Sequence, residues 1–233
     1  MNYKKDIKNL CLKSPSEEVC GLICFDENLN LKNIPLTNKH KNKKAHFSVD
    51  ESEYIKCILS YDVIMCFHSH PCGTANPSKH DKKVSEELGL PFLIYSIEKD
   101  SFYLHIPDSF KPKSLVGRMY VESLYQCNNI VEDYFLLYDK SYKRGMIKNY
   151  CFERDDKFLL KIMNKNFYKV NGIEDVQVKD VFLFNFPTQP CCHMGIYIGN
   201  GEFLHQPENA LSKSEILDHK WQKRMCNIYR LKS

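Results

Sequence analysis

The apolar and polar positions of the N-terminal part of the chain predict a mixture of helices and strands. Apolar residues recur at helical spacing up to about Lys13 and again over residues 51–59, where Asp50 can cap the helix. Continuous apolar runs of strand length lie at residues 19–25, 63–67, 91–97 and 102–106. A polar loop rich in lysine and asparagine is expected between the first of these runs and Lys44. This pattern predicts an α+β fold.

A change of composition divides the chain in two. Residues 107–114 read Pro-Asp-Ser-Phe-Lys-Pro-Lys-Ser, which is typical of a linker, so we expect one domain over residues 1–106 and a second over residues 115–233. In the second domain, residues 127–138 show helical spacing, and residues 181–186, 194–198 and 203–204 read as short strands with an Asn200-Gly201 turn. A helix followed by strands again predicts an α+β domain.

Composition restricts the class of protein further. The 33 Lys and Arg against 29 Asp and Glu give a net charge of +4 that is spread along the chain, so we expect no nucleic-acid binding. No apolar run approaches the roughly 18 residues of a membrane span, and the N-terminus leads into no apolar signal region, which predicts a protein made in a cytoplasm. The 11 cysteines include no CxxC pair, which argues against a tetracysteine zinc site.

Two histidines at the end of a predicted strand form the first candidate site. His68 and His70 are separated by one residue, so on a strand both side chains point to the same face. Asp81 follows at a predicted helix start that Ser78 can cap, and two imidazoles with one carboxylate are the ligand set of a catalytic zinc site. A metalloprotease also needs a general base, for which Glu18 is the candidate.

The full pattern H-S-H-P-x6-S-x2-D with an upstream E-x-C-G resembles the JAMM (MPN-type) metalloproteases. This resemblance implies a layered, cytidine-deaminase-like domain that holds one zinc ion per chain and hydrolyses peptide or isopeptide bonds next to a ubiquitin-like tail. It assigns zinc binding to His68, His70 and Asp81, activation of water to Glu18 and oxyanion stabilisation to Ser78. His80 and Cys72 stay open as additional metal ligands.

A thiol and two imidazoles form the second candidate site. A catalytic cysteine is favoured at a helix N-terminus, which stabilises the thiolate, and Cys127 opens the predicted helix 127–138. His193 and His205 lie on two predicted strands joined by the tight turn at residues 200–201, so a hairpin would bring them side by side. One imidazole can then act as the base and the other can orient it.

The region from about residue 115 to residue 231 resembles the NlpC-type papain-like cysteine peptidases. The resemblance implies an α+β papain-like fold that hydrolyses peptidoglycan stem peptides, with Cys127 as nucleophile, His193 as base and His205 as the third polar residue. It also assigns a substrate-stabilising hydroxyl to Tyr120. Gln126 departs from the family pattern, because the residue before the nucleophile is typically Asp.

The order of the two motifs resembles the tail-tip assembly proteins of lambda-like siphophages. This resemblance implies a hydrolase that is made in the cytoplasm of an infected bacterium and works at the tail tip, with phage tail-tip proteins, a ubiquitin-like tail assembly protein and peptidoglycan stem peptides as partners or substrates. Two alternatives stay open. Both domains could serve as docking modules in which catalysis is incidental, or the chain could be a bacterial deconjugase that removes a ubiquitin-like modifier.

Overall fold

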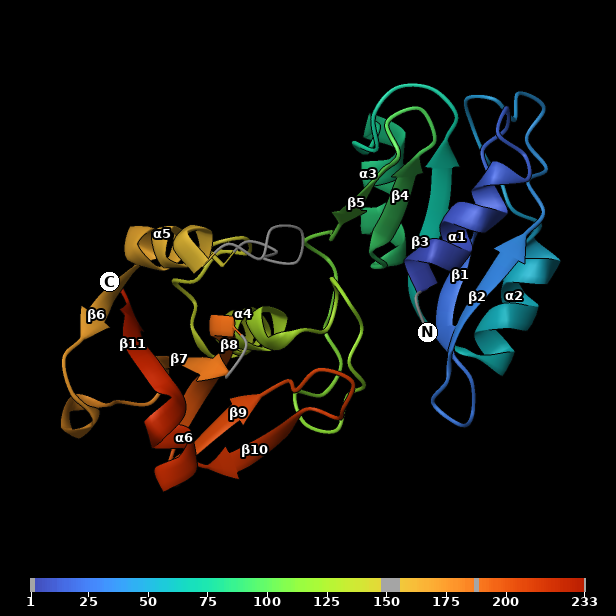
Figure 1. Ribbon diagram of the computed structural model, residues 1–233. Coiled ribbons are helices and arrows are strands. Elements are labelled where there is room, and N and C mark those ends of the chain that lie inside the picture. Colours follow the sequence, from blue (N-terminus) through green and yellow to red (C-terminus); the bar gives the residue numbers. More distant parts are fainter. Residues whose placement is uncertain (1–2, 148–155, 187–188, 233) are drawn as a thin grey trace. The chain divides into compact units, whose positions relative to one another are not determined.

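The computed structural model describes residues 3–147, 156–186 and 189–232. The chain divides into two compact units, Met1–Lys111 and Pro112–Ser233, each of which has its own sheet (Figure 1). Throughout the described residues, every helix is too short or too polar to cross a bilayer.

The N-terminal unit is built on a five-stranded sheet in the order β2-β1-β3-β4-β5. Its strands are β1 (Cys20–Phe25), β2 (Leu31–Leu36), β3 (Asp62–His70), β4 (Phe92–Ser96) and β5 (Ser101–His105). Only the β3–β4 pair is parallel among these strands, and the helix α3 (Lys79–Leu88) makes the crossover between them. The end of β3 and the start of α3 therefore lie at the same end of the sheet, where His70 and Asp81 are found.

Helices cover both faces of this sheet (Figure 1). The helix α2 (Glu51–Ser60) begins after Asp50, whose side chain accepts from the amides of Ser52 and Glu53. Residues of α2 and α3 pack with the sheet in one apolar cluster that includes Leu22, Cys66 and Ile94. The helix α1 (Tyr3–Leu12) covers the other face of the sheet (Figure 1). Since Cys66 and His68 are two residues apart on β3, His68 faces the same side of the sheet as α3.

The strand β2 corrects the sequence-based expectation of a loop between β1 and Lys44. Leu31–Leu36 pairs antiparallel with β1, and Pro35 lies directly opposite Gly21. A Cβ on Gly21 would lie 2.3 Å from the carbonyl oxygen of Ile34, so only glycine permits this approach of the two strands. The strand character of β2 is hard to recognise in the sequence because β2 is a half-exposed edge strand that contains Lys32, Asn33 and Pro35.

The C-terminal unit is built on a six-stranded antiparallel sheet in the order β10-β9-β8-β7-β11-β6. Its strands are β6 (Phe167–Val170), β7 (Val181–Phe186), β8 (Gln189–Gly199), β9 (Glu202–His205), β10 (Lys213–Ile216) and β11 (Met225–Leu231). Its helices are α4 (Cys127–Tyr138), α5 (Asp156–Asn166) and α6 (His219–Arg224), with a short 3-10 turn η2 at Ile173–Asp175.

Alternating side chains of β7 supply two cores on opposite faces of this sheet. Val181 and Leu183 join a cluster with residues of α4, whereas Phe182 and Phe184 join a second cluster against which Trp221 of α6 packs. The helix α4 has the bounds expected from the sequence, because its apolar positions Ile130, Val131 and Phe135 follow helical spacing and are fully buried. The first residue of α4 is Cys127.

Candidate active sites

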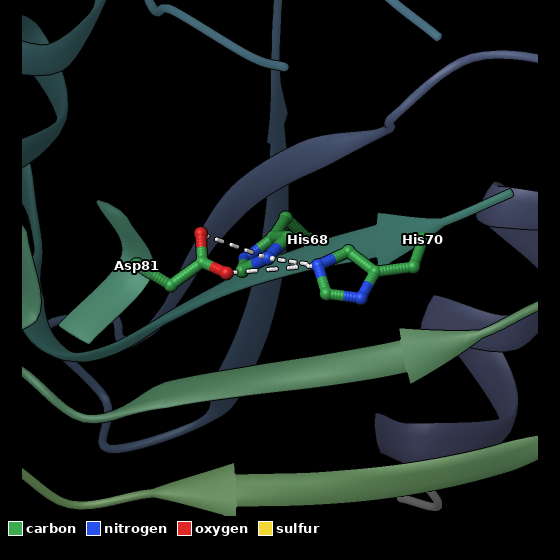
Figure 2. Close-up of side chains that lie close together, drawn as sticks. All are labelled: His68, His70 and Asp81. Carbon is green, nitrogen blue, oxygen red and sulfur yellow. Dashed lines mark hydrogen bonds and ion pairs between the residues drawn. The ribbon is translucent and has the colours of Figure 1, made fainter. Parts of the chain in front are cut away.

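The structure brings the imidazoles of His68 and His70 together with the carboxylate of Asp81 (Figure 2). The Nε2 atoms of the two histidines are 3.1 Å apart, and Asp81 oxygens lie 3.4 Å from Nε2 of His68 and 3.7 Å from Nε2 of His70. The side chain of His68 is fully buried and that of Asp81 is 7% exposed. His80 and Cys72 are exposed and lie outside this cluster.

The start of α3 holds Asp81 in place through a reciprocal capping box. Ser78 is the N-cap residue, and its Oγ accepts from the amide of Asp81 at 3.1 Å while Asp81 Oδ2 accepts from the amide of Ser78 at 2.7 Å. The same carboxylate thus closes the first turn of the helix and faces the two imidazoles. The ring of His70 is fixed by Nδ1, which donates to the carbonyl of Thr74 at 2.8 Å; in the neutral ring Nε2 then carries no hydrogen and can bind a metal, whereas in the protonated ring Nε2 donates to Asp81.

This donor set fits a zinc ion. Tetrahedral zinc with bonds of about 2.0–2.1 Å separates its ligand atoms by roughly 3.3 Å. The two Nε2 atoms are 3.1 Å apart, and one oxygen of Asp81 lies 3.4 Å from His68 and the other 3.7 Å from His70, so the three side chains lie close to that spacing. Two imidazoles and one carboxylate leave a fourth position for a reacting group, as in catalytic zinc sites.

Burial and mutual contacts shift the pKa values of all three groups. Burial lowers the pKa of His68. Burial also opposes protonation of His70, but its hydrogen bonds to Asp81 and to the carbonyl of Thr74 outweigh this and raise its pKa. Although burial disfavours the charged carboxylate, hydrogen bonds from the two imidazoles hold the pKa of Asp81 well below its usual range. Asp81 is therefore ionised and ready to bind a cation at neutral pH.

Glu18 lies beside this cluster at the start of β1. Cys20 of β1 pairs with His68, and the pairing continues towards Glu18 because the amide of Ser69 donates to the carbonyl of Val19 at 2.8 Å. The Glu18 residue is 8% exposed, and burial raises the pKa of its carboxyl to about 7 against the opposing effect of His70. A carboxyl that titrates near neutral pH suits a general base.

In the C-terminal unit, the structure brings the two predicted imidazoles into contact. His193 Nε2 lies 2.8 Å from His205 Nδ1, and both rings are almost completely buried. Their strands β8 and β9 pair so that Gly195 lies opposite His205. A Cβ on Gly195 would meet the ring of Phe203 at 2.7 Å, so glycine is needed at this position. Burial lowers the pKa of His193 to about 3 and that of His205 to about 4, which keeps both rings neutral at pH 7.

Two residues that sequence reasoning missed complete this site. Trp221 packs against both imidazoles, with ring centroids 6.2 Å from His193 and 5.2 Å from His205. Its indole nitrogen donates to Glu215 at 2.7 Å, and Glu215 in turn lies 3.7 Å from Nε2 of His205. Trp221 could have been identified from the sequence because it is the one tryptophan of the chain. Glu215 could not, because it lies in a short polar strand without a recognisable pattern.

Cys127 and Tyr120 lie on the helix side of this unit. Cys127 is the first residue of α4 and packs against the core cluster that contains Met194. His193 alternates with Met194 on β8, so its side chain lies on the other face of the sheet, against Trp221. Gln126 is the N-cap residue, and its side-chain amide donates to the hydroxyl of Tyr120 at 3.0 Å. Gln126, which departs from the family pattern, therefore binds the hydroxyl of Tyr120, the group that the resemblance expects to stabilise the substrate.

Each half of the chain matches a known protein family. Residues 5–105 match the family described as prokaryotic homologs of the JAB domain, and residues 123–230 match the NlpC/P60 family. The predicted fold class is confirmed, because an α+β JAB-type domain precedes an NlpC/P60 domain. A crystal structure of an NlpC/P60 family protein from Bacillus cereus covers 96% of this chain and 66% of its own, at 11% identity and a TM-score of 0.36.

Two curated relatives match most of the length of the chain. The tail tip assembly protein K of Escherichia phage lambda is 24% identical over 186 residues, which are 76% of this chain and 86% of the relative. The protein of the same name from Escherichia phage N15 is 23% identical over 223 residues, 92% of this chain and 88% of the relative. The N-terminal half of the chain is therefore similar to the prokaryotic JAB-type domains, the C-terminal half to the NlpC/P60 family, and the chain as a whole to these phage tail tip assembly proteins.

Proposed function

We propose that this chain is a phage tail-tip assembly hydrolase with two separate catalytic centres, a zinc peptidase in the N-terminal unit and a thiol peptidase in the C-terminal unit. The observation that carries the proposal is the convergence of His68, His70 and Asp81 at the spacing of zinc ligands, with Glu18 beside them. The domain bounds that we propose are residues 1–106 and 115–233, with a linker at residues 107–114.

In the N-terminal centre, each side chain has a chemical role. A zinc ion held by His68, His70 and Asp81 would polarise the scissile carbonyl and lower the pKa of the attacking water. Glu18 takes the proton of that water and returns it to the leaving amine, for which a pKa near 7 is suited. The hydroxyl of Ser78 accepts from the amide of Asp81 through oxygen, so its proton can be donated to the developing oxyanion.

In the C-terminal centre, Cys127 is the nucleophile and His193 is the base. Because Nε2 of His193 contacts His205, its Nδ1 is the atom that takes the proton of the thiol. The start of α4 stabilises negative charge on the sulfur through the helix dipole. Trp221 covers the two imidazoles and excludes water from their hydrogen bond, and Tyr120 lies close to the nucleophile to donate to the substrate.

The relatives supply the biological setting of the proposal. Since the curated relatives are named for tail tip assembly, we propose that the chain acts with other tail-tip proteins in the cytoplasm of the infected bacterium and at the virion tail tip. The N-terminal centre would process a ubiquitin-like tail assembly protein. The C-terminal centre would hydrolyse a stem-peptide bond of peptidoglycan.

Elemental analysis of the purified chain tests the N-terminal centre. About one zinc per chain is expected for the wild type and for Glu18→Gln, because Glu18 is a base and not a ligand. His70→Ala should lose the metal, and His80→Ala is the matched control because its imidazole is exposed and outside the cluster. Zinc in neither the wild type nor the control, even after reconstitution, would make the N-terminal unit a docking module.

Hydrolysis of purified muropeptides tests the C-terminal centre. Cys127→Ala and His193→Ala should abolish the release of stem-peptide fragments. Cys226→Ala is the control, because its thiol donates to a backbone carbonyl of β7, far along the chain from the helix start. Fragments that persist in Cys127→Ala would rule out this thiol as the nucleophile.

A further inference from the structure

The outer nitrogen of His205 faces a carboxylate that the proposed mechanism does not use. Nε2 of His205 is buried and has no hydrogen-bond partner within the described part of the chain. Glu215 Oε2 lies 3.7 Å from this nitrogen. We infer that Glu215 is a positioning residue of the thiol centre, which acts through His205 on the base His193. This inference rests on the proposed function of the C-terminal unit.

Strand pairing places these residues on one face of the sheet. β8, β9 and β10 are consecutive strands, and they carry His193, His205 and Glu215 respectively. In the β9–β10 pair, His205 lies opposite Lys213 and Phe203 lies opposite Glu215, so all four side chains share a face. Any shift of β10 by one residue would turn Glu215 away from His205. The pairing register of β10 thus sets this contact.

Two further contacts fix the carboxylate of Glu215. The indole nitrogen of Trp221 donates to Oε2 at 2.7 Å, and the ammonium of Lys213 forms an ion pair with Oε1. Trp221 follows the N-cap Asp218, whose side chain accepts from the amide of Trp221 at 3.0 Å. Although partial burial disfavours the charged form, these donors and His205 lower the pKa of Glu215, so it is ionised at neutral pH.

The hydrogen bond between the two imidazoles can form with either ring as the donor. If His193 Nε2 donates to His205 Nδ1, then Nδ1 of His193 is unprotonated and can accept the proton of a thiol, while the hydrogen of His205 lies on Nε2. In the reverse arrangement, the hydrogen of His193 lies on Nδ1 and the ring cannot act as a base towards Cys127. A carboxylate next to His205 Nε2 favours a hydrogen on that atom and therefore selects the competent arrangement.

The same carboxylate stabilises the charge that forms during the reaction. When His193 takes the thiol proton it becomes a cation, and its hydrogen bond passes part of that charge to His205. The charged groups that face His205 are Glu215, which raises its pKa, and Lys213, which lowers it. Since Lys213 is also paired with Glu215, replacing the carboxylate would leave the ammonium as the nearest charge to the imidazoles.

The experiment measures thiol reactivity and needs no peptide substrate. Full-length Glu215→Gln is compared with the wild type, His193→Ala and Glu202→Gln, since Glu202 lies on β9 but alternates to the other face. The rate of carboxamidomethylation of Cys127 by iodoacetamide is followed from pH 5 to 9 by peptide mass spectrometry, which separates Cys127 from the other cysteines. Glutamine keeps an oxygen for Trp221 and removes only the charge.

A loss of the carboxylate should make Cys127 roughly tenfold less reactive at pH 7 and raise the midpoint of its pH profile by about one unit. Glu202→Gln should match the wild type. A wild-type profile in Glu215→Gln, together with a slow reaction in His193→Ala, would overturn the role of Glu215 and leave the thiol centre intact. Equal rates in the wild type and His193→Ala would overturn both.

A second measurement does not depend on whether the variant folds. Nitrogen-15 chemical shifts of the wild-type histidines report which ring nitrogen carries the hydrogen. The inference predicts that His205 carries it on Nε2 and His193 carries it on Nε2, with Nδ1 of both rings unprotonated. A hydrogen on Nδ1 of His205 would contradict it.

Discussion

Replacement of Asp81 by Asn separates the two functions of this side chain, as a metal ligand and as part of a helix cap. The amide oxygen of Asn can still accept from the amide of Ser78, which the carboxylate does at 2.7 Å. Asn cannot supply the negative charge that balances a metal ion, and it presents a weaker ligand beside His68 and His70. We therefore expect Asp81→Asn to fold and to lose zinc.

Two contributions determine how much stability the N-terminal unit loses in Asp81→Asn: the hydrogen bonds of the carboxylate and the binding of zinc. The side chain of Asp81 is 7% exposed and its carboxylate is hydrogen-bonded, and a hydrogen bond to a buried charge contributes about 1.5–3 kcal/mol to the free energy of unfolding. At a zinc concentration 100 times the dissociation constant, binding adds about 2.7 kcal/mol. For a unit of this size, loss of the zinc contribution alone should lower Tm by on the order of 10–20 °C.

Differential scanning calorimetry with and without added zinc measures both contributions. The one tryptophan of the chain, Trp221, lies in the C-terminal unit, so its fluorescence follows that unit separately as an internal reference. Asp50→Asn is the control, because the Asp50 carboxylate also binds backbone amides at a helix start, as the N-cap residue of α2, and lies outside the cluster of His68, His70 and Asp81. Its Tm and its response to zinc should be close to those of the wild type.

Either of two results would show that Asp81 is not a zinc ligand that stabilises the N-terminal unit. One is an Asp81→Asn protein that keeps a full equivalent of zinc after dialysis. The other is a wild type whose N-terminal transition does not move when zinc is added. A small loss of stability that is equal in Asp81→Asn and Asp50→Asn would show that the carboxylate of Asp81 serves only the helix.

Further predictions concern protons and buried charge. At pH 6 zinc binding should release about one proton more from the wild type than from Glu18→Gln. Glu18, with a pKa of about 7, is protonated at this pH, and a nearby cation lowers its pKa, so the proton is released. Calorimetric titration in buffers of different ionisation enthalpy counts these protons. The C-terminal unit should lose stability as the pH falls from about 6.5 to about 4. His193 and His205 have pKa values near 3 and 4 in the folded unit and bind protons more readily in the unfolded chain. Urea unfolding followed by tryptophan fluorescence measures the free energy of unfolding at each pH, and a value that does not change with pH would contradict the prediction. Arg118→Met should cost about 3–5 kcal/mol, because it leaves the carboxylate of Asp133 buried without its partner at 2.6 Å, and Arg118→Met combined with Asp133→Leu should recover most of that loss in denaturant unfolding.

Local sequence patterns are sufficient to predict those elements whose structure depends on residues close together in the chain. The helix α4 was predicted with its bounds because its buried positions follow helical spacing, and the capped start of α2 at Asp50 follows from side-chain chemistry. The three candidate zinc ligands were also predictable, since two of them alternate on one strand and the third lies three residues after a cap, at Ser78.

Edge strands and contacts between strands could not be predicted in this way. The strand β2 contains Pro35 and polar residues, and it is a strand because β1 offers a partner with Gly21 at the point of closest approach. The contact of Glu215 with His205 depends on the register of β10, which no local pattern specifies. Both features become visible only when residues far apart in the sequence are paired.

The central claim is that one chain holds two independent hydrolytic centres. The most direct test incubates zinc-loaded wild type, Glu18→Gln, Cys127→Ala and the double variant with a peptide library and with purified muropeptides, and identifies the products by mass spectrometry. We expect Glu18→Gln to lose only the library products, Cys127→Ala to lose only the muropeptide products, and the double variant to lose both. Loss of both sets in either single variant, or no products from the wild type, would contradict it.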